Sequence, residues 1–190
     1  MPHKRLFIGG FFLLLIASCL AAGFLNHDES LRFTPKGEML FPAQYREWVW
    51  LSSGLGMSYT QGAAENPEPK FDNVFVSPAA YRTFVATGTW PSGTVLMLEI
   101  RASRHQGSIN LTGHYQGDLL DVEAHVKKPD GTWAFYGFGE GDKPARVIPH
   151  EASCYSCHEQ HGAVDTTFVQ FYPTLLKVAK EKKILKNDGE

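Results

Sequence analysis

The most specific chemical signal in the chain is the pentad Cys154-Tyr155-Ser156-Cys157-His158. Its spacing, C-x-x-C-H, is the attachment signature of c-type haem. Each thiol adds to one haem vinyl group, and the adjacent histidine is thereby placed under the iron as the proximal ligand. Because the chain contains one such pentad, we expect one covalently bound haem c per chain, with Cys154 and Cys157 as anchors and His158 as iron ligand.

Two other interpretations of the pentad remain open. A structural or redox-active disulfide between Cys154 and Cys157 would not require the adjacent histidine, and no βαβ pattern precedes the motif. Zinc could recruit Cys154, Cys157, His158 and His161. However, adjacent ligands at 157 and 158 strain a tetrahedral shell, and a second spaced pair is absent. Haem therefore explains more of the pattern than either alternative.

The first 25 residues consist of a short charged start followed by an apolar run. Lys4 and Arg5 precede residues 6–25, an apolar run without a charge, as in an export signal. Within this run Cys19 ends the tetrad IASC, which resembles the bacterial lipobox, where the cysteine is lipidated. Cleavage, lipidation and retention as an anchor all remain open, since about 20 apolar residues can span a bilayer. Each outcome predicts an extracytoplasmic protein, in the bacterial periplasm or anchored at the membrane.

Residues 26–190 are expected to form a single domain. The whole chain has 190 residues, of which 43% are hydrophobic, which is enough for one sizeable core. Lys and Arg total 18 against 20 for Asp and Glu, and no basic stripe is concentrated anywhere. We therefore expect no nucleic-acid partner, and membrane contact only through the N-terminal segment.

The sequence predicts mainly strands in the middle of the chain, together with helices, as the elements that position the pentad. Short apolar or β-forming runs bounded by turn residues predict strands at 47–52, 73–77, 94–101, 119–126 and 132–138. The turn signal at 128–131 predicts that the last two form an antiparallel hairpin. Residues 77–88 predict a short helix, with Ser77 as cap, Pro78 at the first position and Gly88 at the end. Apolar spacing of 3 and 4 after residue 165 predicts a C-terminal helix kinked near Pro173, and the fold class is α+β with an antiparallel sheet.

From about residue 36 to residue 180 the chain resembles the cytochrome P460 family, which includes the β-sheet cytochromes c′. The shared pieces are Lys36-Gly37-Glu38, Pro42, Tyr45 to Val49, Val76-Ser77-Pro78, Tyr81, Gly93-Thr94-Val95, Glu123-Ala124, Trp133 to Tyr136, Cys154 to His158, Phe168 and Phe171-Tyr172-Pro173. The resemblance implies a five-stranded antiparallel sheet with flanking helices and a homodimer. It also implies a haem iron left five-coordinate by one histidine.

Members of this family divide according to the distal side of the haem. Enzymes of the P460 type oxidise hydroxylamine and depend on a lysine cross-linked to the porphyrin, and the matching position here is Leu98. Leucine cannot form that bond, and strand alternation puts Leu96 and Leu98 on one face. With Phe71 and Phe135 as the first aromatic candidates, the resemblance implies an apolar distal pocket. Such a pocket favours nitric oxide or a related small nitrogen species over oxygen, because it lacks hydrogen-bond donors.

Two alternative functions depend on other residues. A hydroxylamine-oxidising or peroxidase-like enzyme needs a distal proton acceptor, for which His150 and Glu151 are the candidates. A simple electron-transfer cytochrome needs a sixth ligand, for which Met97 is the candidate, although alternation puts Met97 opposite Leu98 and favours core packing. Electron transfer in any of these functions requires a redox partner, which the sequence does not identify.

Overall fold

The computed structural model describes residues 31–58, 68–141 and 143–186. The apolar segment 6–25, with Cys19, therefore lies outside the described residues. Within the part described, no helix combines the length and the apolar character needed to span a bilayer.

The centre of the molecule is a five-stranded antiparallel sheet in which chain order and spatial order coincide. Its strands are β1 (Val49–Leu55), β2 (Lys70–Val76), β3 (Val95–Arg104), β4 (Tyr115–Lys127) and β5 (Trp133–Gly137). The predicted class and strand number are thus confirmed; β1 to β4 are displaced or extended by a few residues, and β5 is shorter than predicted. The hairpin between β4 and β5 turns at Gly131, whose φ of 84° is one that L side chains rarely adopt.

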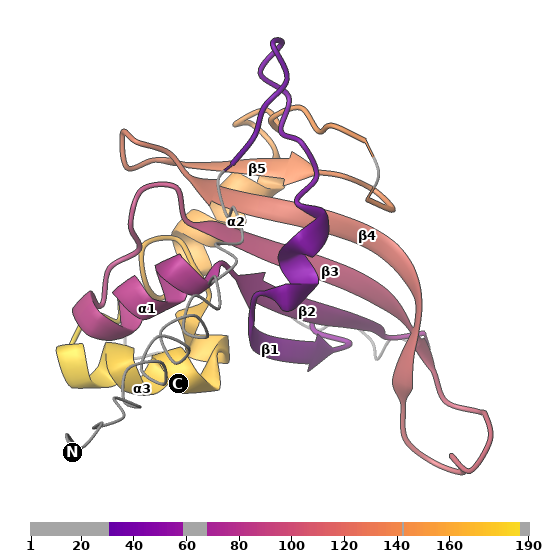
Figure 1. Ribbon diagram of the computed structural model, residues 1–190. Helices are drawn as coiled ribbons and strands as arrows, with labels where there is room; N and C mark the ends of the chain where they lie inside the picture. The colour runs from indigo at the N-terminus through magenta and orange to yellow at the C-terminus, as the bar shows by residue number, and fades with distance from the viewer. Residues whose placement is uncertain (1–30, 59–67, 142, 187–190) are drawn as a thin grey trace, which may run out of the picture.

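Helices and 3-10 turns flank the sheet (Figure 1). They are η1 (Ala43–Glu47), α1 (Pro78–Thr87), α2 (Ser153–His161), η2 (Val169–Phe171) and α3 (Pro173–Lys182). α1 begins at Pro78 and is capped by Gly88, as predicted, although the Ser77 side chain makes no capping hydrogen bond. The predicted kink at Pro173 is wrong. Pro173 instead starts α3, because a proline without an N–H group fits the first turn of a helix, and the preceding residues form the separate turn η2.

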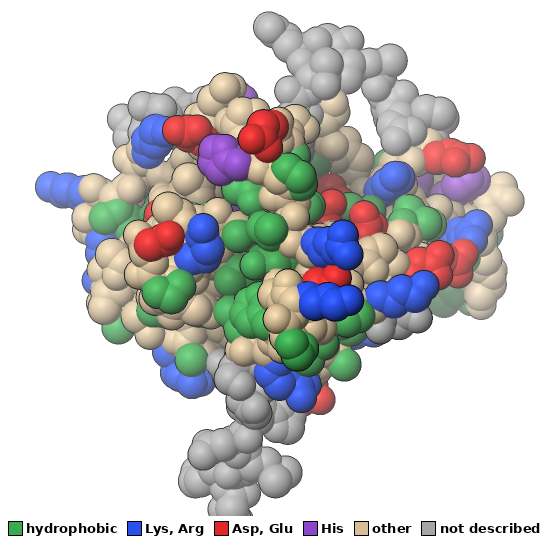
Figure 2. Space-filling model, turned by 90° about the horizontal axis from the view of Figure 1, so that it is seen from above, with side chains coloured by type: hydrophobic (Ala, Val, Ile, Leu, Met, Phe, Trp, Pro, Cys, Tyr) green, Lys and Arg blue, Asp and Glu red, His purple; other side chains and the backbone are tan. Residues whose placement is uncertain are grey.

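Each face of the sheet is covered by its own core. One cluster, hereafter the back core, joins Met39, Tyr45 and Trp48 to residues of β3, β4 and β5. The other packs α1, α3 and the segment around Val169 against the opposite face, where α2 also lies (Figure 1). On the surface seen from above, Lys and Arg side chains are interspersed with Asp and Glu, around a central patch of hydrophobic side chains (Figure 2).

The back core contains one buried carboxylate, Glu99 of β3, which is 4% exposed. It accepts hydrogen bonds from the Tyr45 hydroxyl, from Arg46 Nε at 2.8 Å and from Arg101 Nε at 2.5 Å. Burial alone would raise its pKa, but these hydrogen bonds, led by that of Arg101, outweigh burial and lower the pKa to about 2. The network fastens η1 to the back of the sheet.

Candidate functional site

Helix α2 carries all three residues of the pentad that could bind haem. Cys154 and Cys157 lie one turn apart, and His158 lies four residues after Cys154, so the three side chains share one side of the helix. Both thiols are free and half-buried, and burial raises the pKa of the Cys154 thiol. No residue of α2 is fully buried, and the helix contacts the sheet through Tyr155 and His158, whose rings pack against that of Phe135.

The imidazole of His158 is oriented by the backbone. Its Nδ1 lies 2.8 Å from the carbonyl oxygen of Thr166, which assigns Nδ1–H as the donor and leaves Nε2 with its lone pair. Burial lowers the pKa of His158, and the hydrogen bond to Thr166 opposes that effect only in part. Burial therefore favours the neutral ring, which is the form that binds a metal ion.

Three rings surround His158. Those of Phe168, His125 and Phe135 have centroids 4.4, 4.7 and 4.7 Å from it. His125 stacks on Phe135 at 4.1 Å with an interplanar angle of 7°, and burial holds its pKa well below the ordinary value. His125 Nε2 and the nearby Trp133 Nε1 are buried without a hydrogen-bond partner in the described structure. These rings pack closely around His158, the expected iron ligand.

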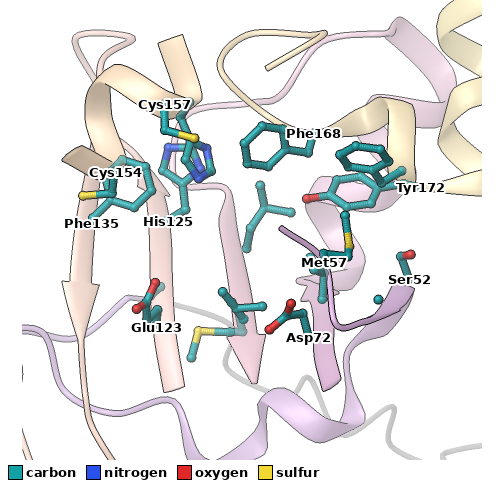
Figure 3. Close-up of a pocket in the computed structure, with 18 of the residues that line it drawn as sticks. Ser52, Met57, Asp72, Glu123, His125, Phe135, Cys154, Cys157, Phe168 and Tyr172 are labelled. Carbon is teal, nitrogen blue, oxygen red and sulfur yellow. The ribbon is translucent and has the colours of Figure 1, made fainter. Parts of the chain in front are cut away.

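A cavity of about 530 Å³ lies between this helix and the sheet (Figure 3). Its sheet wall consists of Ser52, Gly54, Asp72, Val74, Leu96, Met97, Leu98, Glu123, Ala124, His125 and Phe135. The remaining wall consists of Met57, Ser153, Cys154, Cys157, His158, Phe168, Phe171 and Tyr172. Pockets for cofactors have volumes of about 300–1,000 Å³, so this cavity has a suitable size.

Three of the four residues expected around the haem line the cavity, namely Leu96, Leu98 and Phe135. Phe135, however, packs against His158 and so lies on the ligand's side. Phe71 does not line the cavity, and this expectation is wrong. Phe71 pairs with Arg101 and faces the back of the sheet, while its neighbour Asp72 faces the cavity because successive strand residues alternate.

The residues predicted as proton acceptors, His150 and Glu151, lie outside the cavity wall, and the predicted sixth ligand, Met97, only touches it. His150 and Glu151 are exposed and do not line the cavity, and the His150 ring packs 4.5 Å from that of Tyr155. Met97 is fully buried in the back core, as alternation predicted, and only borders the cavity. A methionine that the sequence did not single out, Met57, also lines it.

Two carboxylates were missed by the sequence reasoning. Asp72 and Glu123 line the cavity, and Glu123 is the direct cross-strand partner of Leu98. Burial raises the pKa of both, and in Glu123 the charges of Asp121 and Asp72 add to the effect. Among the described residues neither makes a hydrogen bond or a salt bridge. Alternation within one strand does not find them, because their place in the cavity depends on how β2, β3 and β4 pair.

The residues present fit a haem. Two free thiols one helical turn apart, an imidazole with Nδ1 engaged and a cavity of suitable volume meet at one place. A zinc site fits less well, because within residues 31–58, 68–141 and 143–186 no three His, Cys, Asp or Glu side chains gather as ligands. A disulfide is not formed between the two cysteines.

Comparison with known proteins gives one finding. A family model described as Cytochrome P460 matches residues 42–169, more than half of the chain. The match begins just before η1, includes every strand and the pentad, and ends as η2 begins. No curated protein matches significantly.

Proposed function

The chain belongs to the cytochrome P460 family, and on this premise we propose that it is an exported mono-haem c-type cytochrome that binds nitric oxide or a related small nitrogen species. Because it belongs to this family, the chain is a haem-binding cytochrome. We further propose that the haem is attached covalently, that it has a single axial ligand and that it binds a nitrogen species. The observation that carries it is the geometry of α2. Two free thiols and an imidazole with Nδ1 engaged border one cavity.

In this proposal Cys154 and Cys157 are the covalent anchors. Each thiol adds across one vinyl group, so that its sulfur bonds to one vinyl carbon and its hydrogen to the other. His158 Nε2 is the axial ligand, and the bound haem iron supplies a site for a diatomic molecule and one-electron redox chemistry. Leu96 and Leu98 keep part of the opposite wall apolar, which favours nitric oxide over oxygen.

Covalent attachment is tested with Cys154→Ala/Cys157→Ala, produced with the c-type haem maturation system. We expect the wild type to keep haem on a denaturing gel and the double variant to lose all of it. Cys19→Ala is the matched control, because Cys19 is not part of the pentad. Retention of covalent haem by the double variant would exclude attachment through these thiols.

Axial ligation is tested with His158→Gly, which keeps both thioethers. We expect it to lose the spectrum of a histidine-ligated ferrous haem and to regain it when free imidazole is added. His161→Gly, on the same helix, should keep the wild-type spectrum. If His158→Gly retains both the wild-type spectrum and wild-type nitric oxide binding, the assignment of His158 fails.

The open coordination site is tested by the ferrous absorption spectrum under argon, followed by titration with nitric oxide and with oxygen. An ordinary five-coordinate, high-spin spectrum with nitric oxide binding and no stable oxygen adduct supports the proposal. A low-spin spectrum would instead favour an electron carrier with a sixth ligand. Met57→Leu and Met97→Leu would then identify the ligand, and Met57 is the thioether whose side chain lies over Gly54 in the cavity.

Glu123 favours a second candidate function, oxidation of hydroxylamine or reduction of peroxide. Such chemistry needs a proton acceptor within reach of the bound molecule, and Glu123 faces the cavity beside Leu98. Hydroxylamine-dependent reduction of an artificial electron acceptor, lowered about 100-fold in Glu123→Gln, would establish it. His150→Gln, at an exposed site, is the control. A broad, strongly red-shifted Soret band would further reveal a porphyrin cross-link that Leu98 cannot form.

The proposal also includes the location of the protein and its partners. The charged start and apolar run of residues 1–25 support export, and N-terminal sequencing with mass spectrometry would distinguish cleavage, lipidation of Cys19 and retention. The family resemblance supports a homodimer, which sedimentation would test. A separate redox partner is required wherever electrons leave the haem.

A further inference from the structure

The carbonyl that holds His158 belongs to a tight turn of unusual backbone conformation. Val164 and Thr167 bridge the turn by two backbone hydrogen bonds of 3.3 and 2.8 Å. The two residues between them, Asp165 and Thr166, have φ values of 47° and 59°. Positive φ is tolerated by aspartate but is a genuine outlier for a β-branched threonine. Thr166 Oγ1 is also buried without a hydrogen-bond partner in the described structure.

Two neighbouring segments hold this turn in place. Trp90 Nε1 donates to Thr167 Oγ1 at 3.0 Å, and that hydroxyl donates to the Val164 carbonyl at 2.6 Å. Lys127, at the end of β4, donates to Asp165 Oδ2 at 2.6 Å and to the Trp90 carbonyl at 3.0 Å. The turn is therefore tied both to the sheet and to the loop after α1.

The turn also lies directly against the end of the haem helix. A Cβ atom placed on Gly162 would come within 2.6 Å of both the His158 carbonyl oxygen and the Thr166 carbonyl carbon. Only glycine allows the two backbones to approach this closely. The position of the Thr166 carbonyl relative to His158 is thus set by packing that a larger side chain at 162 would disrupt.

We propose that residues 162–167 form a clamp that fixes the ring of His158, with Thr166, Asp165 and Lys127 as positioning residues. The proposal rests on His158 being the iron ligand. A backbone conformation that is unfavourable for threonine persists only where the surroundings hold it, and here they hold the one oxygen that accepts from Nδ1–H. The partner of the other imidazole nitrogen fixes the ring orientation and raises the basicity of a metal-binding histidine. The Lys127–Asp165 pair therefore acts on the haem iron through Thr166 and His158.

The test compares Lys127→Met with Lys128→Met in the holoprotein. Lys128 is the next residue and is exposed, and it approaches Asp130 only at 3.8 Å. We expect Lys127→Met to shift the iron–histidine stretching band in the ferrous resonance Raman spectrum. We also expect it to change the dissociation constant for carbon monoxide by about threefold or more, while Lys128→Met leaves both unchanged.

A second variant separates positioning from stability. Thr166→Gly keeps the carbonyl and removes the steric conflict of a Cβ atom at positive φ, so its unfolding midpoint should not fall. Because the turn becomes more flexible, the iron–histidine band should nevertheless broaden or shift. If this band is unchanged in both Lys127→Met and Thr166→Gly, the clamp is overturned, whatever happens to stability.

This outcome is distinguishable from failure of the proposed function. If the wild type shows an iron–histidine band that disappears in His158→Gly, the axial ligand is established independently of the clamp. If the wild type shows no such band, both proposals fail together.

Discussion

Glu99 and Glu123 are carboxylates on neighbouring strands of one sheet, and they face opposite sides. Glu99 pairs across the strands with Val122 and faces the back core, where two arginines and a tyrosine bind it and its pKa falls to about 2. Glu123 pairs with Leu98 and faces the cavity, where burial and nearby acids raise its pKa. Glu99 thus stabilises the fold on one face of the sheet. On the other face Glu123 makes one part of an otherwise largely apolar cavity wall polar.

This difference indicates that the two faces of the sheet have different roles: the back core stabilises the fold, and the cavity face serves the function. The carboxylate of the back core is paired within the chain, as expected where only folding is at stake, and among the described polar atoms there Trp48 Nε1 is the exception without a hydrogen-bond partner. The cavity face retains carboxylates and a buried histidine nitrogen without hydrogen-bond partners in the described structure. Changes on the back should therefore alter the free energy of unfolding, and changes on the cavity face should alter the haem.

The largest effect on stability is expected for Glu99→Gln. The substitution leaves Arg46, Arg101 and the Tyr45 hydroxyl without their shared anion, and we expect a loss of about 3 kcal/mol in urea unfolding at pH 7. Glu38→Gln, which removes a partly exposed partner of Arg146, is the control. A loss no larger than that of the control would contradict the assignment of Glu99 to stability.

The same residue predicts a pH dependence. The native pKa of Glu99, about 2, lies below its ordinary value of 4.5, so its stabilising contribution is present above pH 4.5 and is lost as the pH falls toward 2. Wild-type stability should fall over this range more steeply than that of Glu99→Gln. Parallel curves from urea midpoints at each pH would count against this linkage.

An intermediate effect is expected for Phe135→Leu compared with Phe71→Leu. Both substitutions replace an aromatic side chain with a smaller one, and each should cost about 1–2 kcal/mol. Only Phe135 packs against His158 and His125, so only its substitution should shift the ferrous haem spectrum. Equal spectral changes in the two variants would remove the distinction between the faces.

The smallest effect on stability is expected for Glu123→Gln. Because the native pKa of Glu123 is raised, its contribution is most favourable at low pH and is lost as the pH rises through that pKa. At pH 8 the variant should therefore equal or exceed the wild type by about 1 kcal/mol or less, with the difference vanishing at pH 4. A destabilised variant at pH 8 would mean that Glu123 has a stabilising partner.

Much of this architecture could be predicted because it depends on local signals. Alternating apolar residues, the turn before Gly131 and the Ser77-Pro78 start of α1 all act over a few residues. The face on which Phe71 lies could not be predicted in the same way. Both faces of the sheet are buried, so alternation shows that Phe71 and Phe75 share a side but not which side holds the cavity.

The pentad was visible in the sequence, whereas its setting was not. Asp72 and Glu123 meet only because β2, β3 and β4 pair in one register. Of the two positive-φ residues in the turn at 165–166, only Asp165 is of a type common there, and a β-branched residue such as Thr166 does not predict such a turn. Each of these features arises from tertiary packing.

The way α2 is attached has a consequence for how the protein matures. Tyr155 and His158 hold the helix against Phe135, whereas Cys154 and Cys157 are half-buried where they line the cavity. Both thiols are therefore within reach of a porphyrin that enters the cavity, with the sheet intact. Once bonded, the porphyrin would add apolar contacts to this helix, so we expect haem attachment to stabilise α2 more than the strands.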